Sequence, residues 1–350
     1  MTRRDPPSIP LPPYRSGPNA RLYITTQVLL FAAEQLGVPH EVLDYPESLL
    51  TIGRGKHRVY LHKEMLPLND NAADWVFNRK WLAHLVLRRE GLPLPRTYLA
   101  RTWDEVRAAA RRLGFPRRPV VVKPERGTQG SGVAADIRTP NELRSAYQHA
   151  RTFVLSTGRE RYLVQAHHPG SDHRCFVLNG RCIAVARRYH PRIVGDGRST
   201  VRDLVAQHDR RSARAAEGML GRFVLDREFQ RMLSRAKLSV DSVPAAGREV
   251  RVRSNANGSM GAWSEDVTDQ VSPYIRQLVE KTARAAGLAL AGVDVLSDNI
   301  AGRTAGSARP AIVEVNSRPT LLPHHYPLAG QPRQVAYEMV RALARMAARR

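Results

Sequence analysis

Two apolar segments near the C-terminal end of the sequence carry acidic side chains within them. The segment AIVEVNS, residues 311–317, places Glu314 and Asn316 among residues that favour buried strands. Because these two residues are two positions apart, their side chains leave an extended strand on the same face. Burying a carboxylate is costly unless it is paired or binds a metal. The segment therefore predicts a buried strand that holds a metal or a cation on one face.

The second apolar segment, AGVDVLS at residues 291–297, contains one acid, Asp294. If the two segments pair in a sheet, Asp294 faces Glu314 and Asn316. Three oxygen-bearing side chains on one sheet face suit a hard cation such as Mg²⁺. The alternative is that Asp294 caps a turn while Glu314 pairs with an arginine.

The segment VVVKPERGTQGSGV joins an apolar strand that ends at Lys123 to a run of glycines. Small residues such as Gly130, Ser131 and Gly132 let backbone N–H groups approach phosphate oxygens, and a lysine adds a positive charge. The lysine precedes the glycines, so this is not the P-loop pattern. An ordinary flexible turn is the alternative. Lys80, at the start of a predicted helix, can also point at a phosphate, although a solvated lysine is the usual case.

The rest of the sequence alternates helical and strand-like segments and predicts the α+β class. A strand hairpin is expected to turn at Asn179–Gly180, and one helix is expected from Asp70 to about Gly91. Residues 205–250 are basic and only weakly patterned. Antiparallel sheets are expected to dominate the second half of the chain.

Composition restricts the class of partner. The net charge of +23 fits either arginine at solvated positions or an anionic partner such as a nucleotide, an acidic peptide or a nucleic acid. No RNA- or DNA-binding motif accompanies the scattered basic residues, so nucleic acid is the least favoured partner. The two cysteines, Cys175 and Cys182, give no disulfide framework and fit a reducing cytoplasm. No apolar run is long enough for a membrane span, so no membrane contact is expected.

A strand lysine, a glycine-rich loop and an Asp…Glu-x-Asn pattern, in this order, resemble the ATP-grasp superfamily. The likeness covers about residues 22–331, with a poor match at 205–236. The longer motifs are similar to the ATP-grasp half of cyanophycin synthetase: LLTIGRGKHR, YLVQAHHPGSDHRCFVLNGRCIAVARR, IVGDGRSTVRDLV, EDVTDQVSP, AGVDVLS and EVNSRP. The Mur-ligase-like half of cyanophycin synthetase has no counterpart here. A standalone enzyme is therefore expected, without full cyanophycin synthesis.

The resemblance implies an ATP-grasp fold with an N-terminal pre-ATP-grasp α/β subdomain. The implied parts are a flexible Pro-rich arm at 1–19, the pre-ATP-grasp subdomain at 20–79, the ATP-grasp domain at 80–332 and a C-terminal helix at 333–350. The nucleotide would lie between the two subdomains of the grasp, with a hinge near residues 163–172.

The resemblance also assigns ligand contacts to residues. The implied ATP contacts, with the phosphates, the adenine and the ribose, are Lys80, Lys123, Gly130, Ser131, Gly132, Gln165, Ala166, His168 and Asp172. Asp294, Glu314 and Asn316 would bind Mg²⁺, with two ions expected and Mn²⁺ accepted in their place. The implied catalytic residues are Arg174, Arg188, Arg253 and Asn316, and the implied substrate contacts are Arg187, Asn255, Asn257 and Arg318.

Four residues depart from the family pattern, and one of them is Thr320, which follows Pro319 where relatives have glycine. Gln165 stands where relatives usually carry glutamate, so it brings no charge to the adenine site. Arg318 follows the metal strand where relatives have a small residue, and Trp263 lies in a loop that is usually built of small residues. Both are expected to reshape the acceptor pocket, and an arginine fork binds carboxylates bidentately. The alternative for Arg318 is an ion pair with a nearby surface acid.

The predicted function is an ATP-dependent carboxylate–amine ligase that forms an amide through an acyl phosphate. Its substrates are expected to be small: an amino acid or an acidic peptide. Two alternatives stay open, namely a ligase that adds an amino acid to a protein tail and a non-catalytic nucleotide-binding module. A homodimer through Met339 and Met346 of the C-terminal helix is an alternative to packing that helix in the core.

Overall fold

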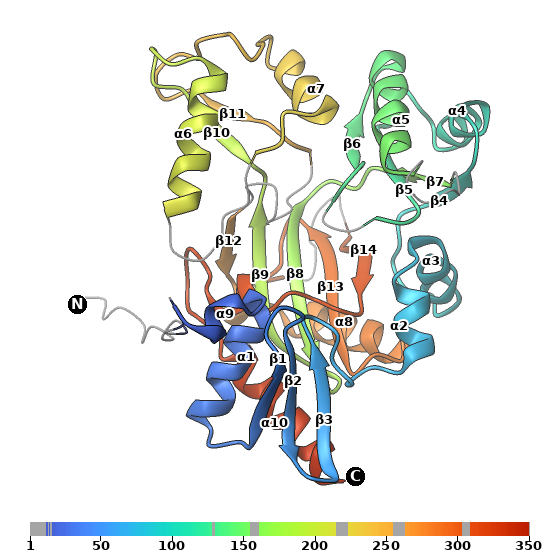
Figure 1. The fold of residues 1–350 in the computed structure, drawn as a ribbon. Helices are drawn as coiled ribbons and strands as arrows, with labels where there is room; N and C mark the ends of the chain where they lie inside the picture. Colours follow the sequence, from blue (N-terminus) through green and yellow to red (C-terminus); the bar gives the residue numbers. More distant parts are fainter. Residues whose placement is uncertain are drawn as a thin grey trace.

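The computed structural model describes residues 12, 14, 16–127, 130–154, 161–214, 223–254, 263–302 and 309–349. Within these residues the strands form four sheets, and all strand pairs are antiparallel. Figure 1 shows a central five-stranded sheet with three smaller units around it. The protein is therefore of the α+β class, as predicted.

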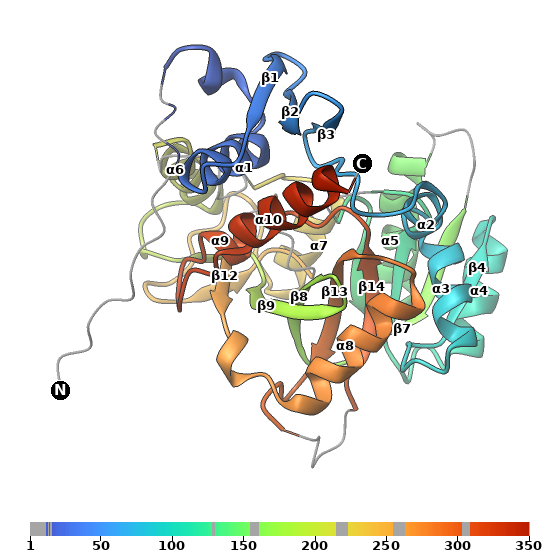
Figure 2. The ribbon, with the colours of Figure 1, turned by 90° about the horizontal axis from the view of Figure 1, so that it is seen from below.

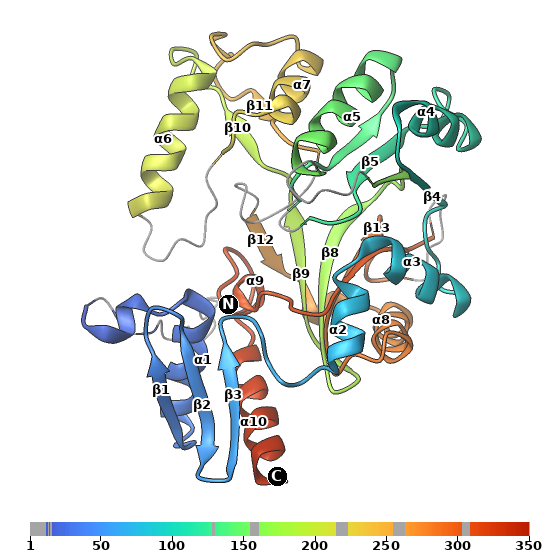
Figure 3. The same ribbon diagram turned by 45° about the vertical axis from the view of Figure 1, so that its right-hand side comes forward.

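The N-terminal unit combines the first and the last segments of the chain. Its elements are η1 (Pro18–Arg21), α1 (Ile24–Gln35), β1 (His40–Asp44), β2 (Leu49–Arg54), β3 (His57–His62) and α10 (Val335–Ala348). Figures 2 and 3 show α10 lying along α1 and against the sheet of β1, β2 and β3. Met339 on α10 is buried in one core with Leu29 and Ile52. The C-terminal helix thus packs in the core of its own chain, which removes Met339 from any dimer surface.

The central sheet carries the two acidic strands. Its strand order is β12 (Trp263–Asp266), β9 (Arg181–Tyr189), β8 (Ser171–Leu178), β13 (Leu290–Ser297) and β14 (Ala311–Asn316). The hairpin between β8 and β9 turns at Asn179–Gly180, where both residues have positive φ, 48° and 76°. This turn is the predicted one, since asparagine and glycine tolerate such a conformation. A helix, α8 (Pro273–Ala285), covers one face of the sheet.

Alternation along these strands separates a core face from a polar face. Arg174 on β8 lies opposite Asp294 on β13. The following residue on β8, Cys175, and the preceding one on β13, Val293, are fully buried in the core that includes α8. Because successive side chains leave a strand on opposite faces, Arg174 and Asp294 share the face away from α8.

The four-stranded sheet and its two helices form the second of the smaller units. Its order is β4 (Thr97–Ala100), β7 (Tyr162–Ala166), β5 (Val120–Pro124) and β6 (Ala134–Ile137), and its helices are α4 (Trp103–Arg112) and α5 (Pro140–Val154). Ala110, Ala146, Val120 and Val164 pack in one core between the helices and the sheet. The predicted strand, glycine-rich turn and strand are β5 and β6 with the segment between them, of which residues 128 and 129 lie outside the described residues.

The third unit occupies the region that the sequence pattern describes poorly. It contains β10 (Arg192–Val194), β11 (Glu249–Arg251), α6 (Val201–Arg214) and α7 (Arg227–Arg235). The N-terminus of α7 is capped by Asp226, whose carboxylate accepts from the Phe229 N–H at 3.0 Å. Arg235 of α7 donates to Asp136 and Glu142 of the four-stranded unit. Partly buried ion pairs therefore join these two units.

The helix expected from Asp70 to Gly91 is divided in two, which corrects that prediction. The two helices are α2 (Asn71–Phe77) and α3 (Lys80–Arg89). The Asn78 side chain donates to the Asp74 carbonyl at 2.8 Å, and Arg79 has an extended backbone that ends the first helix. The break makes Lys80 the first residue of α3. The remaining short helices are η4 (Thr268–Gln270) and α9 (Leu322–His325).

The helices give no evidence of a membrane span. None of those in the described part of the chain has the length and apolar character that a membrane span requires.

Candidate active site

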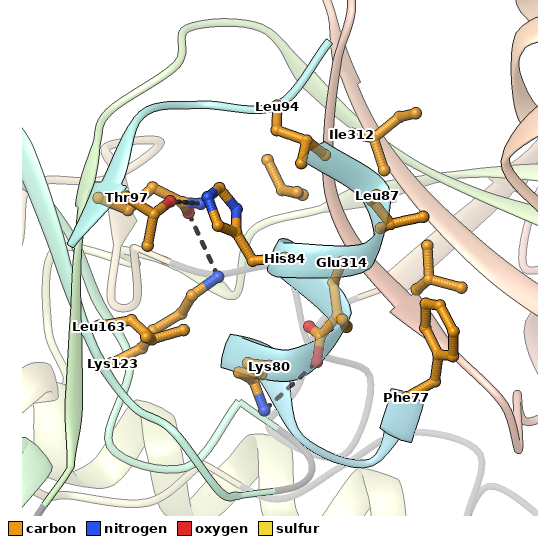
Figure 4. Close-up of a pocket in the computed structure, with 14 residues that line it drawn as sticks. Phe77, Lys80, His84, Leu87, Leu94, Thr97, Lys123, Leu163, Ile312 and Glu314 are labelled. Atoms are coloured by element: carbon orange, nitrogen blue, oxygen red, sulfur yellow. Dashed lines mark hydrogen bonds and ion pairs between the residues drawn. The ribbon is translucent and has the colours of Figure 1, made fainter. Parts of the chain in front are cut away.

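A small cavity lies where α3 and the four-stranded sheet meet β14. Its volume is about 30 Å³, and its walls include Lys80, His84, Lys123, Gln165 and Glu314 (Figure 4). A water molecule in the liquid takes about this volume. The cavity in this conformation therefore has room for a water molecule, and a purine base requires the two sheets to move apart or side chains to turn.

Two lysines reach this cavity from different elements. Lys80 Nζ lies 3.3 Å from Glu314 Oε1 and donates to the Gly127 carbonyl at 2.6 Å. Lys123 on β5 is buried, and its Nζ donates to Gln165 Oε1 at 3.2 Å. We call Lys80, Lys123, Gln165 and Glu314 the lysine cluster. It contains two cations and one carboxylate.

Burial dominates the titration of Lys123. It lowers the pKa of this lysine to about 8, while Glu314 raises it and Lys80 lowers it further. The neutral Gln165 amide accepts a hydrogen bond but cannot balance the charge. An anion placed between the lysines would therefore stabilise the charged form of Lys123.

The two acidic strands pair as the sequence predicts. Asp294 on β13 lies opposite Glu314 on β14, and Gly292 lies opposite Asn316. Burial would raise the pKa of Glu314, but Lys80 and Lys123 outweigh it and hold this pKa below its ordinary value. Both carboxylates are thus kept ionised beside one another on the polar face.

Asp294 and two arginines form the second group of charges. Arg174 Nη2 donates to Asp294 Oδ2 at 3.1 Å, and its Nε also donates to this carboxylate. Arg188 Nη2 donates to Asp294 Oδ2 at 2.8 Å and to Asp172 Oδ1 at 2.7 Å. We call Arg174, Arg188, Asp172 and Asp294 the arginine cluster. Its two cations face two carboxylates.

The arginines decide the charge of Asp294. Burial would raise the pKa of Asp294, but Arg174 and Arg188 lower it below the ordinary value. For Asp172 burial prevails over the attraction of Arg188, and the pKa is raised. The arginine cluster is therefore a fixed, paired network that places guanidinium groups beside Asp294.

A glycine makes room for one of these arginines. A Cβ atom on Gly292 would lie 3.1 Å from Arg174 Cδ and 2.7 Å from Pro319 Cβ. The contact with Pro319 is shorter than real Cβ atoms make, and the one with Arg174 would force the arginine to shift, so the position favours glycine for close approach. Gly292 thus allows Arg174 to lie across β13 toward Asp294.

The metal site predicted at Asp294, Glu314 and Asn316 fits in part. The Asn316 amide nitrogen is buried and has no hydrogen-bond partner among the described residues. An amide turned by 180° would put its oxygen there, since the two ends are assigned and not observed directly. The described residues contain no group of three histidine, cysteine or acidic side chains placed to hold a metal. Two carboxylates and one amide therefore remain as the donor set, and both carboxylates are paired with cations.

Comparison with known proteins identifies this arrangement. Residues 77–202 match the RimK-like ATP-grasp domain family. Over 320 residues the chain is 31 % identical to cyanophycin synthetase from a Nostoc species, covering 91 % of this chain and 34 % of that protein. The glutathione biosynthesis bifunctional protein GshAB from Streptococcus mutans is 30 % identical over 317 residues, covering 89 % of this chain and 41 % of that protein.

A comparison of folds agrees with the sequence comparison. The crystal structure of a bifunctional glutathione synthetase from Pasteurella multocida superposes with a TM-score of 0.61 and 25 % identity, over 93 % of this chain and 44 % of that one. The chain contains a RimK-like ATP-grasp domain. It spans between a third and a half of the length of the curated relatives named here, 34 % and 41 %.

The hinge predicted in this ATP-grasp domain lies on β7 and the segment after it. Gln165 is buried, and its Nε2 donates to Thr97 Oγ1 at 2.8 Å. The Ala166 N–H donates to the Arg96 carbonyl at 2.9 Å. His168 lies beyond the strand, where its ring nitrogen is 2.7 Å from the Pro169 carbonyl. Three predicted nucleotide contacts lie in this region: Gln165, Ala166 and His168. Of these three, Gln165 alone lines the small cavity.

The glycine-rich loop of the ATP-grasp domain has backbone conformations that favour glycine. Gly130 and Gly132 have φ values of 71° and 70°, and Ser131 lies between them. A Cβ atom on Gly132 would lie 3.0 Å from Phe153. The predicted flexible turn and the predicted phosphate loop both fit this geometry.

The predicted arginine set is not brought together as a whole. Arg187 lies next to Arg188 on β9, so its side chain leaves the sheet on the opposite face. There it donates to Ser171 Oγ at 2.9 Å and lies over the Tyr189 ring at 4.9 Å. The Tyr189 ring stacks on Trp263 with centroids 3.9 Å apart. Arg187 and Trp263 therefore belong to one stack, away from the arginine cluster.

Arg253 is fully buried and contacts the third unit. Its Nη2 donates to Asp226 Oδ2 at 2.8 Å and to the Val224 carbonyl at 3.0 Å. Its Nε and Nη1 atoms have no partner among the described residues. Asn255 and Asn257, which were predicted as substrate contacts, lie outside the described residues.

Arg318 makes the ion pair that the alternative interpretation expects. Its Nε donates to Asp74 Oδ1 at 3.0 Å, and its Nη2 donates to Asp74 Oδ2. Asp74 also accepts from Ser317 Oγ at 2.6 Å. The fork geometry is therefore present, with a carboxylate of the chain itself bound in it.

Two polar residues of the cavity, His84 and Thr97, were missed in the sequence analysis. Burial lowers the pKa of His84 to about 4, and Arg88 and Lys123 contribute to this shift. The Thr97 hydroxyl accepts from Gln165 Nε2 and donates to the Pro95 carbonyl. His84 lies four residues after Lys80 on α3, so helical spacing places both on one side. That spacing is a signal the sequence contains, whereas Thr97 has none.

Proposed function

We propose that this protein is an ATP-dependent carboxylate–amine ligase. The observation that supports it most strongly is the assembly of the lysine cluster and the arginine cluster around Asp294 and Glu314. Two facing sheets bring these charges together from α3, β5, β8, β9, β13 and β14. The likeness to cyanophycin synthetase and GshAB is in accord with amide-bond ligation.

ATP binds between the sheets in this proposal. Lys80 and Lys123 contact its phosphates, since they are two cations with one carboxylate between them. Gly130, Ser131 and Gly132 supply backbone N–H groups to the same phosphates. Gln165 faces the adenine, and Asp172 faces the ribose.

In the first step a substrate carboxylate oxygen attacks the γ-phosphorus of ATP. The bond to the β–γ bridging oxygen breaks, ADP leaves and an acyl phosphate forms. This transfer needs positioning and charge stabilisation rather than proton transfer. Arg174 and Arg188 stabilise the charge that develops on the transferred group, because their guanidinium planes are already fixed by Asp294 and Asp172.

Asp294, Glu314 and the Asn316 oxygen are the residues that would hold Mg²⁺. Bound there, the ion would neutralise phosphate charge and orient the transfer. Their pairing with Arg174, Arg188 and Lys80 keeps the two carboxylates ionised and in place beforehand.

In the second step a neutral amine attacks the acyl carbon and displaces phosphate, which forms the amide. An amino acid or an acidic peptide is the proposed substrate class. The arginines and the net charge of +23 favour substrates that are rich in carboxylates. The same charge favours the second candidate, a ligase that acts on an acidic protein tail.

The decisive experiment is ATP turnover measured with a library of amino acids and peptides. ADP and phosphate release should require both a carboxylate and an amine substrate, and mass spectrometry should find the amide. Turnover only with an acidic protein tail would select the second candidate. Nucleotide binding without turnover for any pair would leave a non-catalytic nucleotide-binding module.

A further inference from the structure

A second cavity, of about 210 Å³, lies beside the end of β14. Its walls come from the segment between β3 and α2, from Leu290 at the start of β13 and from Ser317 and Arg318, which directly follow Asn316. One liquid water takes about 30 Å³. The cavity therefore accommodates a group of about amino-acid size next to the acidic strand.

The walls of this cavity are fastened to the strands of the site. Asn69 Nδ2 donates to the Leu290 carbonyl at 2.8 Å and to the Ser317 carbonyl at 2.7 Å. Its Oδ1 accepts from the Leu290 N–H at 2.8 Å. One amide thus ties the segment between β3 and α2 to the start of β13 and to the residue that follows β14. The cavity holds a fixed position relative to Asp294 and Asn316.

The charged residues of the cavity differ in how far they are neutralised. Asp74 and Arg318 satisfy one another, and Ser317 completes the contacts of Asp74. Glu64 has no ion pair within the described part of the chain, and the Tyr23 hydroxyl donates to its Oε1 at a long 3.4 Å. Burial raises the pKa of Glu64, although Tyr23, Arg174 and Arg318 act in the opposite direction. A cation next to Glu64 would supply the missing charge.

We infer that this cavity binds the protonated amino group of the carboxylate substrate, with Glu64 as its counter-ion. The inference rests on the proposed ligase function. The substrate is then an α-amino acid or a peptide with a free amino end, and its carboxylate points toward Arg174. A substrate held at both ends in this way is placed for reaction, since binding at a remote group fixes the reacting one.

The position of Glu64 supports this direction of binding. Glu64 lines the cavity together with Ser317, the residue after Asn316 of the acidic strand. Arg174, which acts to lower the pKa of Glu64, also holds Asp294. Glu64 lies in the segment between β3 and α2, whereas Arg174 and Asp294 lie on the central sheet. A ligand between them therefore bridges the cavity and the polar face.

The test measures direct binding of small probes and needs no turnover. The probes are free amino acids and the same amino acids acetylated on the α-nitrogen, detected by saturation-transfer NMR with and without a non-hydrolysable ATP analogue. The variants are Glu64→Gln and, as a matched control, Glu47→Gln, an exposed glutamate of the same unit. Thermal unfolding and nucleotide affinity of both variants check that the fold is intact.

The wild-type protein should bind the free forms at least about tenfold more tightly than the acetylated forms, since a charge-assisted hydrogen bond is lost on acetylation. Glu64→Gln should remove this preference and Glu47→Gln should keep it. Equal binding of both forms, no binding of either form, or an unchanged preference in Glu64→Gln would overturn the inference.

Turnover separates this inference from the proposed function. Glu64-dependent binding without ADP formation for any substrate pair would contradict the ligase and leave the cavity as an amino-group site. Amide formation that is indifferent to Glu64→Gln would contradict the cavity assignment and leave the ligase.

Discussion

The lysine cluster and the arginine cluster differ in their balance of charge. In the lysine cluster, Lys80 and Lys123 share one carboxylate, Glu314, and the fourth member, Gln165, is neutral. In the arginine cluster, every guanidinium is paired with Asp172 or Asp294. The pKa of Lys123 falls to about 8 as a consequence of its burial, whereas that of Asp294 stays below its ordinary value. The lysine cluster thus carries one positive charge that no carboxylate of the cluster balances, and the arginine cluster is organised before any ligand binds.

The largest effect on turnover is expected for Glu314, because its strand β14 pairs with β13, which carries Asp294 of the arginine cluster. Glu314→Ala removes the one carboxylate of the lysine cluster and a proposed Mg²⁺ ligand. Turnover should fall at least about a hundredfold, comparable to the loss of one transition-state stabiliser. Steady-state ADP formation is the measurement, with Glu249→Ala, an exposed glutamate paired with Arg192, as the control. Activity near that of the control would remove β14 from the mechanism.

A smaller effect is expected for the lysines alone. Lys123→Ala should weaken ATP binding by about tenfold to a hundredfold, the cost of one charge-assisted hydrogen bond. Lys237→Ala, which alters an exposed lysine, should leave the affinity unchanged. Calorimetric titration with ATP compares the two. Equal affinities would mean that the lysine cluster is structural.

Titration gives a further contrast between the clusters. The pKa of Lys123 is about 8 in the free protein, and bound phosphate would raise it. Below this pH the lysine is already charged and ATP affinity is at its maximum. As the pH rises above it, binding must add a proton, and affinity should fall by up to about tenfold per pH unit. Lys123→Arg stays charged, so an identical pH profile in that variant would assign the dependence to another group.

The smallest effect is expected at the edge of the site. Arg318→Lys replaces a fork by a point charge and should raise the Michaelis constant for an acidic substrate a few-fold, without changing ATP affinity. Arg341→Lys, on the exposed side of α10, is the control. Unchanged constants for both substrates would leave Arg318 as the partner of Asp74 and nothing more.

The alternation of side chains along a strand made the register of the acidic strands predictable. The same alternation was not applied to the assignment of Arg187. A period of two fixes which residues share a face, so Asp294, Glu314 and Asn316 were grouped correctly. The same period separates Arg187 from Arg188, yet the resemblance assigned both to the active site, Arg188 as a catalytic residue and Arg187 as a substrate contact. Alternation along β9 would have corrected this from the sequence alone.

Other features depend on contacts that no local pattern contains. α7 was missed because Arg231 and Arg235 look solvated, whereas Glu228 and Glu142 pair with them at the junction of two units. The break between α2 and α3 depends on the side chain of Asn78 turning back to the Asp74 carbonyl. The cavity at Glu64 joins segments more than 200 residues apart, as the Asn69 contacts with Leu290 and Ser317 show. Such neighbours become visible only in the folded chain.

The central claim is that the two clusters act together on ATP and a carboxylate. Positional isotope exchange tests it most directly, with ATP labelled with ¹⁸O at the β–γ bridging position and a carboxylate substrate found in the library screen. Reversible acyl phosphate formation moves the label to a non-bridging position of the β-phosphate without the amine. We expect this exchange in the wild-type protein and its loss in Glu314→Ala, which should still bind ATP. Amide formation with no exchange and no detectable acyl phosphate, or exchange that persists in Glu314→Ala, would contradict it.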